Sequence, residues 1–128
     1  MTAKPADVKA LLDRYCRAMS ETDRETWLDC FADDAVQEDP VGSEPNLGRA
    51  AIGAFFDSTP VPIHIYQTQD PLVIGTEVLA FFAVDADIDG TKMHLPRIVD
   101  HIVLTDDGAR IQRLRAFFDY AELGPKSV

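Results

Sequence analysis

The stretch "VLAFFAVDADIDGTKMHLPRIVDHIVL", residues 78–104, decides the fold that this chain is expected to adopt. Its even positions from 78 to 88 stay apolar, whereas the odd positions turn to aspartate at 85, 87 and 89. This two-residue period predicts a strand that has one solvated face at its far end. Asp89 and Gly90 form a strong hairpin signal, so the chain should return as a strand over about residues 92–104. Pro96 cannot donate a ladder hydrogen bond and predicts a bulge or a local break in pairing.

Before this hairpin, three apolar stripes at helical spacing predict that the first 58 residues are helical. The first helix follows Pro5, a residue that suits a first turn, and Thr22 with Glu25 forms a capping-box pattern for the second helix. The third helix is expected to end near residues 57–60. The stripes consist of Val8, Leu11, Leu12, Tyr15, Cys16 and Met19, then Trp27, Leu28 and Phe31, then Ile52, Phe55 and Phe56.

Further strands are expected on both sides of the hairpin. Apolar residues alternate at 61, 63 and 65, and the turn at residues 106–108 leads into a last strand. One face of that strand carries Leu114, Ala116, Phe118 and Tyr120, and the other carries Arg113 and Arg115. Helices followed by a long, mostly antiparallel sheet indicate an α+β fold. We therefore expect one domain, residues 1–128, in which a curved six-stranded sheet and three helices form a conical barrel with an apolar pocket.

Composition narrows the functional classes. The 128 residues are 46% hydrophobic and 27% charged, which is typical of a globular domain. Twelve Lys and Arg against 22 Asp and Glu give a net charge of −10, so nucleic acid and anionic membranes are poor partners. The first residues lack the apolar core of a signal peptide, and no apolar run is long enough to insert into a membrane. Cys16 and Cys30 fit a reduced protein, and a cytoplasmic location is expected.

No metal or cofactor is predicted. The stretch "DADIDG", residues 85–90, resembles the start of a calcium-binding loop, but Pro96 stands where such a loop needs a glutamate. The surrounding pattern is also that of a strand, so these aspartates are interpreted as solvated residues near a turn. The three histidines, at positions 64, 94 and 101, lack metal-ligand spacing.

Three residues are candidates for chemistry. Asp100 shares the apolar face of its predicted strand with Ile98 and Ile102, so burial should favour its neutral form. Tyr15 lies on the apolar stripe of the first helix, where its hydroxyl needs a partner. In "AVQEDPVGSEP", residues 35–45, the proline restricts Asp39 to an extended conformation. Asp39 can then point inward while Glu38 points outward.

Each candidate also has a structural interpretation. Asp100 could be a buried aspartate held by an amide or an arginine, Tyr15 an ordinary core tyrosine, and Asp39 part of an acidic surface turn. Together they supply a carboxylate base and two hydrogen-bond donors, which is what proton transfer beside a developing oxyanion requires. The combination is more informative than any one of them.

At these residues the chain resembles the bacterial ketosteroid isomerases, which have the nuclear-transport-factor-like cone fold. The resemblance runs from "RYCRAM" to "RLRAFF", and "FADDAVQEDPVGSEP" is its most specific segment, supported by "IGAFFDS" and "VDHIVLTDDGARI". It implies a cofactor-free conversion of Δ5-3-ketosteroids to Δ4-3-ketosteroids through a dienolate. Asp39 matches the base that carries the proton from C4 to C6, and Tyr15 and protonated Asp100 match the oxyanion donors.

The resemblance also implies a pocket for a hydrophobic steroid and a homodimer. The dimer contact is expected on the outer sheet face, where Arg113, Arg115 and Phe117 project. Candidate pocket walls are Val41, Phe56, Phe82, Leu114 and Phe118.

The sequence departs from the family pattern at two positions and leaves other functions open. Phe31 and Phe56 stand where family members often have tyrosines that support the oxyanion tyrosine. The cone fold also hosts dehydratases, polyketide cyclases, epoxide hydrolases and binding modules. Two alternatives therefore remain: a polyketide cyclase or dehydratase-type enzyme that acts on another hydrophobic substrate, and a non-catalytic lipid- or steroid-binding module.

Overall fold

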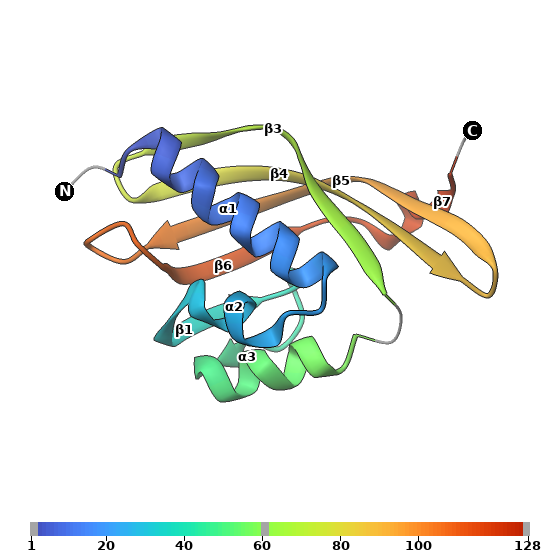
Figure 1. Cartoon of the computed structure of the whole chain (residues 1–128), viewed down its shortest axis with the longest axis horizontal. Helices are drawn as coiled ribbons and strands as arrows, with labels where there is room; N and C mark the ends of the chain where they lie inside the picture. Colours follow the sequence, from blue (N-terminus) through green and yellow to red (C-terminus); the bar gives the residue numbers. More distant parts are fainter. Residues whose placement is uncertain (1–2, 60–61, 127–128) are drawn as a thin grey trace.

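The computed structural model describes residues 3–59 and 62–126 of the chain. A curved sheet wraps around one long helix, and the two shorter helices lie side by side at the bottom of the view (Figure 1). The helices are α1 (Pro5–Ser20), α2 (Arg24–Asp29) and α3 (Gly48–Asp57), with a 3-10 turn η1 at Tyr120–Glu122. The strands are β1 (Phe31–Glu38), β2 (Asn46–Leu47), β3 (Ile63–Ile74), β4 (Glu77–Ile88), β5 (Thr91–Leu104), β6 (Ile111–Phe117) and β7 (Gly124–Pro125).

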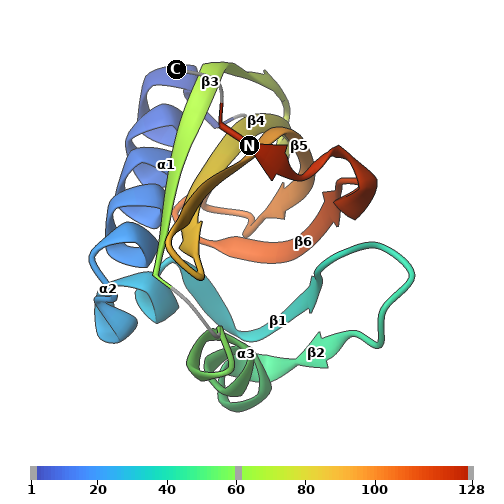
Figure 2. The same ribbon diagram turned by 90° about the vertical axis from the view of Figure 1, so that its right-hand side faces the viewer.

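Six strands form the sheet in the order β2-β1-β6-β5-β4-β3, and the two-residue β7 adds to β5. Only the β1–β6 pair among these strands is parallel. Seen from the end, the sheet curls from β3 round to β2, with α1 across its concave side (Figure 2). The predicted α+β fold, with three helices and a mostly antiparallel six-stranded sheet, is thus confirmed and matches the cone fold.

The central hairpin forms as predicted. Asp89 and Gly90 make the turn between β4 and β5, and both have positive φ angles, 51° and 81°. Two positive φ angles are what a tight two-residue turn requires. Pairing slips between Phe82 and Val84, because β5 has one extra residue at positions 96–97. The bulge predicted from Pro96 is therefore present.

The expectation that the first 58 residues are wholly helical is wrong, because β1 and β2 lie among them. α2 ends at Asp29, whose backbone carbonyl and carboxylate accept hydrogen bonds from Arg110. The amide of Ile111 then donates to the carbonyl of Cys30 at 2.7 Å, so the chain is already paired with β6 where helix was expected. Phe31 accordingly belongs to β1 rather than to α2.

Two smaller expectations also change. The N-cap of α2 is Asp23, whose carboxylate accepts from the amide of Thr26, and Thr22 has a positive φ angle instead of capping the helix. β6 ends at Phe117, so Tyr120 lies in η1 and is largely exposed. The predicted alternation at position 61 lies outside the described residues.

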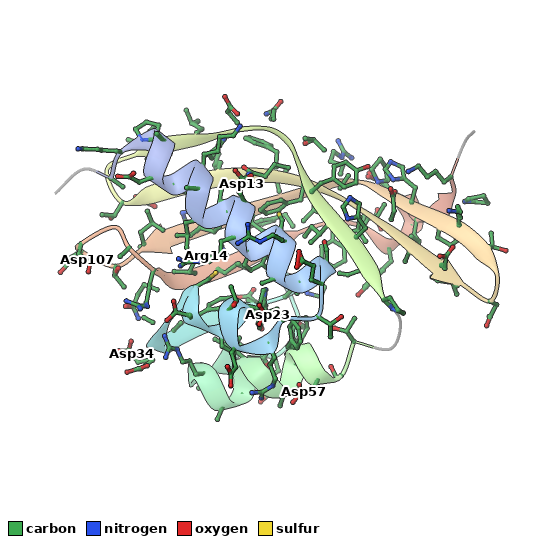
Figure 3. The ribbon with its side chains drawn as sticks, viewed as in Figure 1. Asp13, Arg14, Asp23, Asp34, Asp57 and Asp107 are labelled. Atoms are coloured by element: carbon green, nitrogen blue, oxygen red, sulfur yellow. The ribbon has the colours of Figure 1, made fainter. Side chains whose placement is uncertain are left out.

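The core lies between α1 and the concave face of the sheet. The inner face of α1 is buried along the predicted stripe, except that Met19 is only partly buried. On the other side of α1, Asp13 points towards β3, where its carboxylate accepts from the amide of Gln67 at 2.6 Å (Figure 3). Ser20 and Ile65 add a second link between α1 and β3. α1 is therefore fixed across the sheet. No helix in residues 3–59 and 62–126 has the length and apolar character needed to cross a membrane.

Candidate active site

Strand pairing brings Asp39 and Asp100 into one row across the sheet. β1 and β6 run parallel with Glu38 opposite Arg115, and the amide of Val41 donates to the carbonyl of Ala116 at 2.8 Å. Asp39 therefore lies beside Ala116, which in turn is opposite Asp100 on β5. Adjacent strands are about 4.8 Å apart, so the two aspartates are separated by roughly two strand spacings. Ala116 is the intervening residue of β6 in this row.

Asp100 is an isolated buried acid. It is 3% exposed, and its Oδ1 atom has no hydrogen-bond partner among the described residues. Burial, with a further contribution from the Asp39 carboxylate, raises the pKa of Asp100 well above its usual value. Burial therefore favours the neutral carboxylic acid form of Asp100, and this form can donate a hydrogen bond or a proton.

Asp39 differs from Asp100 in degree. Burial raises the pKa of Asp39 to about 6, so it is mostly ionised at neutral pH and can still accept a proton. Its neighbour Glu38 contacts Arg115 at 3.5 Å and accepts from the amide of Gly42 at 3.3 Å. Glu38 is thus engaged by surface groups, whereas Asp39 is desolvated. The peptide bond between Asp39 and Pro40 is cis.

Tyr15 lies among aromatic rings near both acids. It is 2% exposed, and its ring centroid is 5.8 Å from that of Trp27, 6.1 Å from that of Phe31 and 6.0 Å from that of Phe82. Burial first, then the carboxylates of Asp100 and Asp39, raise the pKa of the Tyr15 phenol well above its ordinary value. The hydroxyl therefore stays protonated. The ring contact with Phe82, which lies on the inner face one row from Asp100, places Tyr15 beside the row of the two acids.

The predicted wall residues divide into two groups. Phe82 and Leu114 are fully buried on the inner face, next to the row that contains Asp100. Val41 is half-buried in the loop after β1. Phe56 lines a hollow of about 350 Å³ with Met19 and Ile63, whereas Phe118 lines a separate hollow of about 300 Å³ beside Phe117. The five residues therefore do not line one common hollow among those described.

The sequence analysis missed one interior polar residue, Gln37. It lies two residues before Asp39 on the same face of β1 and is completely buried. The alternation of side chains along a strand could have revealed it. Residues two apart face the same side, so an inward Asp39 requires an inward Gln37. An apolar residue is usual at such a position.

Several other titratable residues form pairs away from this row. His94 lies 2.7 Å from Asp85, and Lys126 binds the second oxygen of Asp85 at 2.6 Å. His101 lies 3.0 Å from Glu77. Cys16 and Cys30 are free and buried, and burial raises the pKa of both thiols, that of Cys16 to about 12. These thiols are therefore poor nucleophiles near neutral pH.

The fold is an α+β cone, and its interior carries the two carboxyl groups of Asp39 and Asp100. Residues 12–114 match the SnoaL-like domain family, and the chain belongs to that family.

Two individual proteins are similar to this chain. The first is a solved structure titled "Intriguing role of epoxide hydrolase/cyclase-like enzyme SalBIII in pyran ring formation in polyether salinomycin". It has a TM-score of 0.81 and 25% sequence identity, over 93% of this chain and 95% of that one. The second is the epoxide hydrolase LasB of Streptomyces lasalocidi, 48% identical over 40 residues. That match spans 31% of this chain and 14% of LasB. Both are described as epoxide hydrolases or cyclases rather than as steroid isomerases.

Proposed function

We propose that this chain is an enzyme that opens an epoxide in a hydrophobic substrate, by ring closure or by hydrolysis. The observation that carries the proposal is the pair of inward carboxyl groups, Asp39 with a pKa of about 6 and Asp100 with a pKa raised well above its usual value. A base and an acid whose pKa values are pushed apart are the requirement for acid–base catalysis at neutral pH. The similarity to SalBIII and LasB supports the choice of an epoxide.

In this proposal Asp39 takes the proton of a nucleophilic hydroxyl group. For ring closure the hydroxyl belongs to the substrate, and for hydrolysis it belongs to water. The nucleophilic oxygen forms a bond to one epoxide carbon, and the bond between that carbon and the epoxide oxygen breaks. The electron pair goes to the departing oxygen, which takes the proton of Asp100.

Tyr15 can donate a hydrogen bond to the same departing oxygen and stabilise its developing negative charge. At the end of the step Asp39 is protonated and Asp100 is ionised. One proton transfer from Asp39 to Asp100 through solvent restores the starting state. The reaction needs no oxidant, reductant or metal.

The test uses 5,6-epoxydodecan-1-ol, which carries a nucleophilic hydroxyl, an epoxide and an apolar tail. Ring closure gives a product of unchanged mass, whereas hydrolysis adds one water, so chromatography with mass spectrometry separates the two outcomes. We expect the wild type to accelerate one of them and Asp39→Asn to abolish the acceleration. Wild-type rates equal to the buffer control on this substrate and on styrene oxide would overturn the proposal.

A second candidate is the isomerisation of Δ5-3-ketosteroids, favoured by the segment "FADDAVQEDPVGSEP" and by the presence of both Tyr15 and Asp100 as buried donors. Here Asp39 would move a proton from C4 to C6 while both donors bind the C3 oxygen. The ultraviolet absorbance of the conjugated enone formed from 5-androstene-3,17-dione measures this activity directly. Enone formation without epoxide turnover would favour the isomerase. Binding of both compounds without turnover would favour a non-catalytic binding module.

A further inference from the structure

Gln37 combines complete burial with an unpartnered donor. Its side chain is 0% exposed, yet its Nε2 atom has no hydrogen-bond partner within the described part of the chain. The other end of the amide is held, since its Oε1 accepts from Nδ2 of Asn46 at 2.9 Å. Asn46 is the direct cross-strand partner of Gln37 between β1 and β2. The amide is therefore fixed by its oxygen, and its two N–H groups are left free.

A buried amide in this state costs the folded protein free energy, because its N–H groups are removed from bulk water and no described residue accepts from them. An apolar side chain of similar size would avoid that cost at the same position. The cross-strand neighbour on the other side is Leu114, which offers no side-chain acceptor. The arrangement is costly in the free protein and is explained if a ligand supplies the missing acceptor.

The position of Gln37 connects this donor to the candidate site. Residues two apart on a strand face the same side, roughly 6.6 Å apart along the chain. Gln37 thus lies one such step from Asp39, in the inner-face row next to the one that contains Asp39, Ala116 and Asp100. A substrate that extends from the carboxyl row towards β2 would present its next atoms to Nε2 of Gln37.

We propose that Gln37 is a substrate-positioning donor that selects molecules carrying an ether, hydroxyl or epoxide oxygen beside the group handled by Asp39. This inference rests on the proposed function of the Asp39 and Asp100 pair. An amide does not titrate in the working range of proteins, so Gln37 acts as a neutral donor rather than as an acid. A hydrocarbon surface placed there leaves Nε2 unpaired, which disfavours apolar substrates. The preferred substrate class is therefore oxygenated at two neighbouring positions.

The test compares two soluble ligands that differ by one atom, tetrahydropyran-2-methanol and cyclohexylmethanol. Dissociation constants are measured by NMR titration of the ¹⁵N-labelled protein, in which the side-chain amide signal of Gln37 is assigned by its loss in Gln37→Met. We expect the ether to shift this signal and the cyclohexane analogue to leave it unchanged. In Gln37→Met the preference for the ether over the cyclohexane analogue should fall roughly three- to tenfold, the range of one neutral hydrogen bond.

Gln67→Met is the matched control, because Gln67 also donates through Nε2 but does so to Asp13 outside the core. It should leave the ligand preference unchanged. An equal preference in the wild type and in Gln37→Met would overturn the inference. If the wild type and Gln37→Met have equal preferences but the epoxide is still turned over, the proposed function stands and only the role of Gln37 is removed. A Gln37-dependent preference without turnover would retain the binding role of Gln37 and remove the proposed reaction.

Discussion

At the level of single residues, Asp39 and Glu38 are adjacent carboxylates with opposite environments. Glu38 is engaged by Arg115 and by a backbone amide, whereas Asp39 is desolvated beside Ala116. We expect Asp39→Asn to lower kcat/KM on 5,6-epoxydodecan-1-ol by roughly 10²- to 10⁴-fold, the usual contribution of a general base. Glu38→Gln removes a carboxylate at the next position and should change kcat/KM less than threefold. Similar losses in both variants would contradict the assignment of Asp39.

The pH dependence of the reaction follows from the same residue. A base must be deprotonated to act, so kcat/KM should rise with pH through an apparent pKa of about 6 and then level off. Burial raises the pKa of Asp100 as well, in the direction that favours its protonated, proton-donating form. Initial rates between pH 4.5 and 8 measure this profile. A flat profile across this range would exclude Asp39 as the titrating base.

Burial of Asp39 should also cost stability at neutral pH. The pKa of an aspartate is about 3.9 in the unfolded chain, against about 6 for Asp39 in the folded protein. The folded state therefore holds this proton more tightly, and the free energy of unfolding falls as pH rises from about 4 to about 6.

Asp39→Asn removes that penalty. It should raise the free energy of unfolding at pH 7 by up to about 3 kcal/mol, since about two pKa units separate the two states. The gain should shrink below pH 4, where Asp39 is protonated in both states. Urea unfolding at pH 7 and pH 4 measures both values. A loss of stability at pH 7 would show that Asp39 has a structural role.

The sequence predicted some of these residues better than others. Tyr15 and Asp100 could be found because each is a polar group on an otherwise apolar stripe. Asp39 was singled out by the proline that follows it. Gln37 was not predicted, because its importance depends on the free Nε2 atom and on the bond to Asn46 across β2. A two-residue strand such as β2 leaves almost no periodic signal.

At the level of elements, sequence patterns predicted local pairing and failed where pairing is long-range. The β4–β5 hairpin was readable because its turn residues lie between its strands. β1 was mistaken for loop and helix because its partner is β6, about eighty residues later, and its ladder is interrupted between Phe31 and Val36. The apolar residues of this segment consequently lack a clean two-residue period.

The β6 strand also controls the space between the two acids. Ala116 is buried, and its side chain is a single methyl group. It lies between Asp39 and Asp100 in the row across the sheet. Ala116→Val adds two methyl groups there, which should cost about 1–3 kcal/mol of stability by overpacking. It should also lower kcat/KM at least tenfold by filling the volume that a substrate needs.

Ala109→Val is the matched control for this change, since it makes the same substitution at an exposed residue of the turn before β6. Kinetics on 5,6-epoxydodecan-1-ol and thermal melting of both variants complete the measurement. Unchanged kinetics in Ala116→Val would mean that the substrate does not pass between the two acids.

At the level of the whole molecule, the cone fold was predictable and the substrate was not. The order of helices and strands indicates the cone, but wall residues such as Phe56 and Phe118 lie at separate hollows. Which walls a substrate touches depends on how the sheet curls, and single-residue patterns do not encode that curvature. The isomerisation expected from sequence and the proposed epoxide opening would engage the same three polar groups.

The outer face of the sheet leads to a prediction about assembly. Phe117 is 44% exposed there, and Leu79 is 37% exposed on the same face. The Arg115 guanidinium carbon lies over the Phe117 ring, 5.3 Å from the centroid of that ring. Exposed apolar side chains grouped on one face often mark a protein interface. We therefore expect a homodimer through this face, with a mass by light scattering of twice 14.2 kDa.

Phe117→Glu should convert the dimer to a monomer, because a charge at the centre of a self-complementary contact meets its own copy. Leu47→Glu is the control, since Leu47 is 69% exposed but lies on β2 at the far edge of the sheet. Light scattering coupled to size-exclusion chromatography measures both variants at the same concentration. A wild type that is monomeric at 100 μM, or a Phe117→Glu protein that stays dimeric, would show that this face is not the interface. Phe117 neighbours Ala116 on β6, and Ala116 is opposite Asp100 on β5. If pairing of the two sheets fixes the position of Asp100, loss of the dimer should also alter turnover.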